Sequence, residues 1–142
     1  MLFAGSSTKF SQNILAVNHV KQAISDAGHQ LTLDLDEQTT IESVGDAGND
    51  KEDWHILAQR EINAAQDCDV AIFDVTDKAS FGVGYMAAIV LGANKPTLFL
   101  TREGSLEGSF ISGLEHVKIT RSIYTPSTLA NIVIRFLGEI RC

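Results

Sequence analysis

Short apolar runs alternate along this chain with segments in which apolar residues recur every three or four positions. Val70–Phe73 and Thr97–Leu100 have the composition and length of strands buried on both faces. Met1–Ala4 predicts a first strand that is cut short by a glycine. His29–Leu33 and Val117–Ile123 alternate polar and apolar residues, which is typical of strands with one exposed face. The pattern therefore predicts five strands.

Segments with helical spacing of apolar residues separate these strands. We expect helices over Ile14–Ile24, Glu52–Gln66 and Val83–Ala93, and a last helix that opens at Pro126. The connection Glu103–Gly113 has room for a further short helix.

One polar segment separates the first two helices in addition to the expected second strand. Asp34–Asp53 carries eight acids against one lysine, which predicts a solvated loop.

Strands that alternate with helices predict an α/β fold with helices on both faces of a parallel sheet. The best topology is a flavodoxin-like three-layer sandwich, with five mostly parallel strands in the order 2-1-3-4-5. At 142 residues, without a linker or an internal repeat, the chain is expected to form a single domain over 1–142.

Composition and charge limit the function classes. The net charge of −7 argues against a polymeric nucleic acid as partner, whereas backbone amides can still hold a small anion. Neither the cysteines nor the histidines have metal-ligand spacing, so we expect no metal site and no cofactor. No apolar run is long enough for a membrane span, and the chain runs directly into a strand, so a cytoplasmic protein is expected.

Two turns that join a strand to a helix are the first candidates for ligand binding. Gly5–Thr8 and Ser80–Tyr85 should lie side by side where the first and third strands end, because ligands of such sheets bind at the carboxyl ends of the strands. Glycines let a ligand approach the backbone, and serine hydroxyls add donors beside a helix N-terminus. The alternative is that these glycines only make tight turns. The candidate residues that bind a ligand through these turns are Gly5, Ser6, Ser7, Ser80, Gly82 and Gly84.

Three carboxylates are candidates for chemistry. Glu61 lies beside apolar residues in the expected helix Glu52–Gln66, which precedes the central strand Val70–Phe73, and Asp74 and Asp77 follow that strand. For the two aspartates a cap or turn role is the alternative. Ser109 lies in a Gly-Ser segment that could reach a ligand or a neighbouring subunit, or could form a plain loop.

Two stretches resemble the nucleoside 2-deoxyribosyltransferase superfamily, and in particular its 2′-deoxynucleoside 5′-monophosphate N-hydrolases. They are FAGS, Phe3–Ser6, and DCDVAIFDVTDKASFGVGY, Asp67–Tyr85, and the downstream pattern Ala88–Arg102 is also similar. The resemblance implies a homodimer with sites completed across the interface, and cleavage of the N-glycosidic bond of a small nucleoside or nucleotide. It implies that the 5′-phosphate or sugar is held by Ser6, Ser80, Gly82 and Gly84, with Ser109 near a serine that reaches the partner's phosphate. It also places Glu61 where the family has an acidic residue.

One departure from the family pattern concerns the chemistry itself. The family's catalytic carboxylate follows GVGY, where this chain has Met86, and the family's tyrosine in the first strand is replaced by Leu2. A thioether can neither trap nor stabilise an oxocarbenium-like transition state. Two interpretations therefore stay open: an N-glycosidase or deoxyribosyltransferase with a relocated acid (Glu61 first, then Asp74 or Asp77), and an inactive nucleotide-binding module in which Met86 packs against the base or sugar. A third, an FMN electron carrier, lacks an evident aromatic pair to hold the flavin.

Overall fold

The computed structural model describes residues 2–4, 14–32, 51–77, 81–107 and 109–140. Strands and helices alternate along most of this part of the chain, as the sequence pattern predicts. In chain order the elements are β1 (Leu2–Ala4), α2 (Ile14–Asp26), α4 (Lys51–Asp67), β2 (Ala71–Asp74), α5 (Phe81–Gly92), β3 (Thr97–Arg102), α6 (Ser109–Ser112), β4 (Ile119–Tyr124) and α7 (Leu129–Glu139).

The described strands form one parallel sheet in the order β1-β2-β3-β4. This order equals the predicted order with the second strand left out. The expected strand His29–Leu33 is not confirmed: His29 to Thr32 follow α2 without strand structure, and Leu33 lies outside the described residues. The parallel α/β fold is thus confirmed, and the five-stranded description is not.

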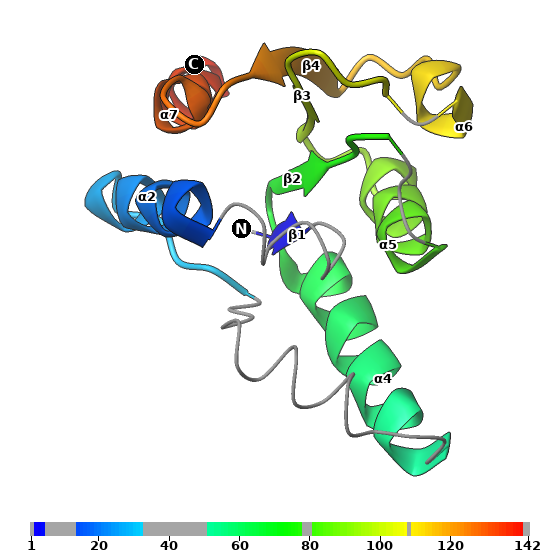
Figure 1. Cartoon of the computed structure of the whole chain (residues 1–142). Helices are drawn as coiled ribbons and strands as arrows, with labels where there is room; N and C mark the ends of the chain where they lie inside the picture. The colour runs from blue at the N-terminus through cyan, green and yellow to red at the C-terminus, as the bar shows by residue number, and fades with distance from the viewer. Residues whose placement is uncertain (1, 5–13, 33–50, 78–80, 108, 141–142) are drawn as a thin grey trace.

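Helices cover both faces of the sheet (Figure 1), and alternate residues of each strand point to opposite sides. Ala71 and Phe73 of β2 belong to a core cluster with α4 and α5, whereas Ile72 belongs to a second cluster with α2 and α7. The side chains of the hydrophobic run Val70–Phe73 are therefore divided between two core clusters, one on each face of the sheet.

Local chemistry explains where several helices begin and end. Gly28 follows α2 with φ +79°, a left-handed conformation that glycine adopts without strain. Asn94 has φ +58° directly after α5, and Pro96 then leads into β3. The Lys95 ammonium group donates to the carbonyl oxygens of Ala65 (3.3 Å) and Gln66 (2.6 Å), which ties the end of α5 to the end of α4.

The prediction of a loop over Asp34–Asp53 is wrong at its C-terminal end. Lys51, Glu52 and Asp53 form the first turn of α4 and are not part of a loop. Residues 34–50 lie outside the described part of the chain.

Candidate functional site

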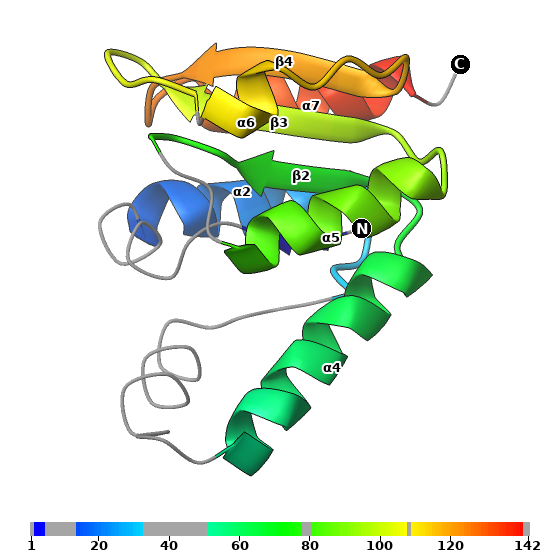
Figure 2. The ribbon, with the colours of Figure 1, turned by 90° about the vertical axis from the view of Figure 1, so that its right-hand side faces the viewer.

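The carboxyl ends of β2, β3 and β4 lie at one edge of the sheet. Figure 2 shows that the start of α5 and the connection between β3 and α6 lie at this same edge. In open α/β sheets this edge is where ligands bind. We therefore describe its side chains first.

Asp74, the last residue of β2, is held by three hydrogen bonds. Its Oδ1 accepts from the backbone N–H of Thr76 (3.0 Å) and from the Thr76 hydroxyl (2.6 Å). Its Oδ2 accepts from the hydroxyl of Tyr124, at the end of β4, at 2.7 Å. Both carboxylate oxygens of this candidate acid are thus engaged within the protein.

Tyr124 is buried, with 3% of its surface exposed. Burial raises the pKa of its hydroxyl far above the ordinary value of 10.0, and the hydrogen bond to Asp74 raises it further. The phenol therefore stays protonated over the physiological pH range and acts as a donor to the Asp74 carboxylate.

Asp77 lies three residues after Asp74 and has an exposed side chain. Its backbone is in the left-handed region, with φ +59°, and its N–H donates to the carbonyl oxygen of Leu106. Aspartate is one of the residues that tolerate this conformation. The turn role that the sequence left open for Asp77 is consistent with this geometry, and a catalytic role stays a prediction.

The first turns of α5 contain the glycines and two aromatic residues. Gly82 and Gly84 are half-buried, and a Cβ added to Gly84 would meet no atom within 4 Å. Phe81 is 89% exposed, and its ring stacks on that of Tyr85 with centroids 6.2 Å apart. Sequence reasoning missed this aromatic pair, although the spacing i, i+4 within an expected helix could have revealed it.

Several candidate residues for ligand binding cannot be compared with the structure. Gly5, Ser6, Ser7 and Ser80 lie outside the described residues, so the proximity of the two turns stays a prediction. Ser109 is the first residue of α6. Its approach to a ligand or to a second subunit also stays a prediction.

Met86 lies on the buried face of α5. It is 4% exposed and belongs to the cluster that includes Phe73, Val83 and Phe99. A role of its thioether in packing is therefore shown, whereas contact with a base or sugar stays a prediction. The same position in the family carries the carboxylate, according to the resemblance.

Glu61 lies on the inner side of α4. Helical spacing places it on the stripe that continues through Ala64, Ala65 and Cys68, which are buried in the core with α5. Partial burial raises the pKa of the Glu61 carboxyl above its ordinary value of 4.5, and the neighbouring Arg60 opposes this rise. A carboxyl with a raised pKa can keep a proton to donate to a leaving base, as a general acid must.

The raised pKa of Glu61 predicts a pH-dependent effect on stability. Above the folded-state pKa the protein holds an ionised, partly desolvated carboxylate, and stability is regained as the pH falls toward 4.5. We expect Glu61→Gln to unfold at a slightly higher temperature than wild type at pH 7, with the difference shrinking as the pH falls toward 4.5. Thermal unfolding between pH 4 and pH 8 measures this. A difference that does not change with pH would contradict the assignment, and Gln59→Glu, at an exposed position of α4, is the control.

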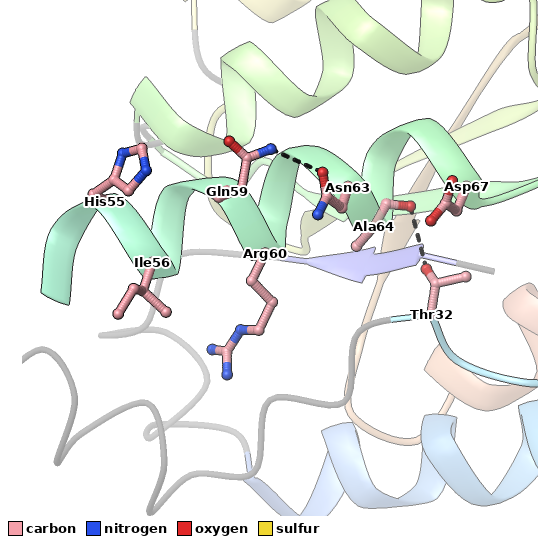
Figure 3. Close-up of a pocket in the computed structure, with 8 residues that line it drawn as sticks. All are labelled: Thr32, His55, Ile56, Gln59, Arg60, Asn63, Ala64 and Asp67. Carbon is pink, nitrogen blue, oxygen red and sulfur yellow. Dashed lines mark hydrogen bonds between the residues drawn. The ribbon is translucent and has the colours of Figure 1, made fainter. Parts of the chain in front are cut away.

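A groove runs along α4 beside Thr32, and it includes Ala64 of this stripe. Its volume is about 640 Å³, and Figure 3 shows its lining side chains. The Gln59 amide donates to Asn63 Oδ1 at 2.9 Å, and the Thr32 hydroxyl donates to the Ala64 carbonyl oxygen at 3.3 Å. The groove is lined by Thr32, His55, Ile56, Gln59, Arg60, Asn63, Ala64 and Asp67. None of these residues forms a recognisable sequence motif, so the groove could not be predicted from the sequence.

Two other kinds of site are not found in the described part of the chain. Within the described residues, no group of three or more His, Cys, Asp or Glu side chains is arranged to hold a metal ion. Among the helices of the described part, none combines the length and the hydropathy needed to cross a membrane.

Comparison with known proteins shows the fold of this chain. No protein-family model matches the sequence, and no curated protein matches it. Among solved structures, the chain is similar to the CMP N-glycosidase BcmB of Clostridium botulinum, with a TM-score of 0.66 over 95% of this chain and 98% of that chain. Because the two sequences are 14% identical, this likeness shows a shared fold.

Proposed function

We propose that this protein processes the N-glycosidic bond of a small nucleotide or nucleoside, by hydrolysis or by transfer of the sugar to a second base. The observation that carries the proposal is the extent of the structural likeness, which spans 95% of this chain and 98% of a CMP N-glycosidase. The sequence resemblance to nucleoside 2-deoxyribosyltransferases supports the same chemistry. That resemblance rests on Phe3–Ser6, Asp67–Tyr85 and Ala88–Arg102.

The proposed site holds the phosphate or sugar through the turns after β1 and β2. Ser6 and Ser80 supply hydroxyl donors, Gly82 and Gly84 admit the ligand close to the first turn of α5, and Gly5 and Ser7 complete the first turn. In hydrolysis the bond between C1′ and the base nitrogen breaks, water forms the new bond to C1′, and a proton passes to the base. In transfer a second base takes the place of water.

Glu61 is the first candidate for the carboxylate, because its raised pKa suits protonation of the leaving base. Asp77 is the second candidate, since its side chain is exposed at the edge where β2 ends. We propose further that the protein forms a homodimer, as the resemblance implies, with Ser109 completing the partner's site. The exposed Phe81 and Tyr85 beside this edge are available for such a contact.

A second function is favoured by one observation. The position that carries the family's carboxylate is occupied by Met86, and this side chain is packed in the core. If no other acid has replaced the missing group, the same site would bind a nucleotide without cleaving it. The resulting protein would be a nucleotide-binding module of the same fold.

Chromatographic detection of free base distinguishes these functions. The purified protein is incubated with nucleosides and 5′-monophosphates of ribose and deoxyribose, CMP and dCMP among them, with and without a second base as acceptor. We expect release of one base, lowered by Glu61→Gln by at least about a hundredfold if Glu61 is the general acid. Gln59→Glu, which leaves Glu61 in place, is the matched control and should retain activity.

The result that would contradict each function differs. Ligand-dependent stabilisation without base release would exclude catalysis and support the nucleotide-binding module. Transfer of the sugar to the acceptor base would establish a transferase. Neither release nor stabilisation by any nucleotide or nucleoside at millimolar concentration would overturn both. Light scattering on the same sample tests the homodimer.

A further inference from the structure

Hydrogen bonds join the carboxyl ends of three neighbouring strands. The Tyr124 hydroxyl, at the end of β4, reaches Oδ2 of Asp74, at the end of β2, across 2.7 Å. The strand β3 lies between these two strands, and its last residue, Arg102, donates its backbone N–H to Thr76 Oγ1 at 3.0 Å. Thr76 in turn donates to Asp74, so all three strand ends belong to one network.

The arrangement of donors around Asp74 is that of a turn-forming aspartate. Oδ1 accepts from both the N–H and the hydroxyl of the residue two positions on, Thr76, which is a local turn interaction. Oδ2 is held by a phenol that is almost fully buried. A carboxylate that attacks C1′ or donates a proton to a base needs an oxygen directed at the substrate, and the contacts of Asp74 instead fix its own loop.

This network holds residues 75–77, the first residues after β2. Val75 donates its N–H to the Leu100 carbonyl oxygen at 2.9 Å, and Asp77 donates to that of Leu106. Thr76 also forms an antiparallel bridge with Glu107. The connection that leaves β2 is thus held against both β3 and the segment that leaves β3.

We propose that Tyr124 and Asp74 are positioning residues, which fix residues 75–77 at the carboxyl edge of the sheet, and that Asp74 is not the catalytic carboxylate. The kinetic consequence rests on the proposed function, whereas the structural consequence does not. Loss of the network loosens the strand ends and the start of the ligand-binding connection, while the sheet itself stays folded.

Backbone amide hydrogen exchange tests the structural part. Tyr124→Phe keeps the buried ring and removes only the hydroxyl, and Asp74→Ala removes both carboxylate acceptors but leaves Thr76 Oγ1, which accepts from Arg102. We expect the Thr76 amide to exchange about tenfold faster in Asp74→Ala, which removes its acceptor. In Tyr124→Phe the Thr76 and Arg102 amides keep their acceptors, and we expect both to exchange faster because Asp74, which fixes Thr76, has lost its hydrogen bond to Tyr124. Tyr85→Phe, which removes a hydroxyl from an exposed tyrosine, is the matched control and should leave both amides unchanged.

The conservative variant Asp74→Asn separates positioning from catalysis. Its amide oxygen can accept from Thr76 and its amide nitrogen can donate to the Tyr124 oxygen, so the network persists without a carboxylate. We expect Asp74→Ala and Tyr124→Phe to raise KM for base release more than they lower kcat, and Asp74→Asn to restore KM.

Each result decides the proposal. Loss of base release in Asp74→Asn with wild-type amide exchange would make Asp74 catalytic and overturn it, and so would unchanged exchange in Tyr124→Phe. If the wild type releases no base, the proposed function fails, but exchange still decides whether the pair positions the connection.

Discussion

Met86→Glu is expected to lower the free energy of unfolding at pH 7 by about 3–5 kcal/mol, because it places an unpaired charge in an apolar core. Met86 is 4% exposed, and its neighbours in the core cluster include Phe73, Val83 and Phe99. Burial will raise the pKa of the new carboxyl, so the folded state will hold its proton to a higher pH than the unfolded state does. The loss of stability should therefore shrink as the pH falls. Chemical denaturation at pH 7 and pH 5 measures both effects.

Two control variants identify burial of the charge as the cause. Met86→Leu conserves volume and should cost less than about 1.5 kcal/mol. Ala88→Glu adds the same carboxylate at an exposed position of α5 and should change stability by no more than about 0.5 kcal/mol. Equal losses in Met86→Glu and Ala88→Glu would show that position 86 is not buried.

The same variant also tests the origin of the site. If Met86→Glu creates or raises base release at a temperature at which it is folded, a substrate reaches position 86, and the methionine has replaced a working carboxylate. A folded variant that binds nucleotide and releases no base would show that position 86 does not face the ligand.

Phe99→Ala is expected to lower the free energy of unfolding by about 3–5 kcal/mol, the usual cost of removing a buried ring and leaving a cavity. Phe99 is fully buried in β3, with its ring centroid 6.0 Å from that of Phe73. On its other side the Arg121 guanidinium carbon lies 5.8 Å from the ring centroid. Arg121 also donates to the carbonyl oxygens of Ile111 (2.9 Å) and Leu114 (2.6 Å) and pairs with Glu107 at 3.1 Å. The ring thus supports the side chain that holds α6.

Phe81→Ala is the matched control, because it makes the same chemical change at an exposed site. It should change stability by no more than about 0.5 kcal/mol, measured by the same denaturant titration. A comparable loss at both positions would contradict the placement of Phe99 in the core. Nucleotide binding by Phe81→Ala, measured alongside, shows whether the exposed ring also contacts the ligand.

Local patterns predicted the helices and most strands well. Asn94 and Pro96 limit α5 through backbone conformation alone, and the alternation of buried strands with helical segments is enough to indicate a parallel α/β sheet. His29–Leu33 shows the limit of this reasoning. Its alternation matches that of a strand, but pairing with a neighbouring strand is a tertiary event, and the described residues His29 to Thr32 are not paired in this way.

The candidate site was predictable only in part. The sequence marked Asp74 as a polar residue at the end of the central strand, and could not show that Tyr124, fifty positions later, would engage it. It also marked Glu61, but whether a carboxyl in an amphipathic helix is desolvated depends on what packs beside it.

By itself, the sequence determined the order of strands and helices and the absence of a metal-ligand motif, and it predicted a difference at Met86 from the family that the chain resembles. These properties depend on residue type and on spacing over a few positions. Only the tertiary structure decided that Met86 is buried, that Tyr124 and Thr76 engage both oxygens of Asp74, and that the pKa of Glu61 is raised. Such properties depend on groups that are distant in sequence, because burial and hydrogen bonding are set by the elements that the fold brings together.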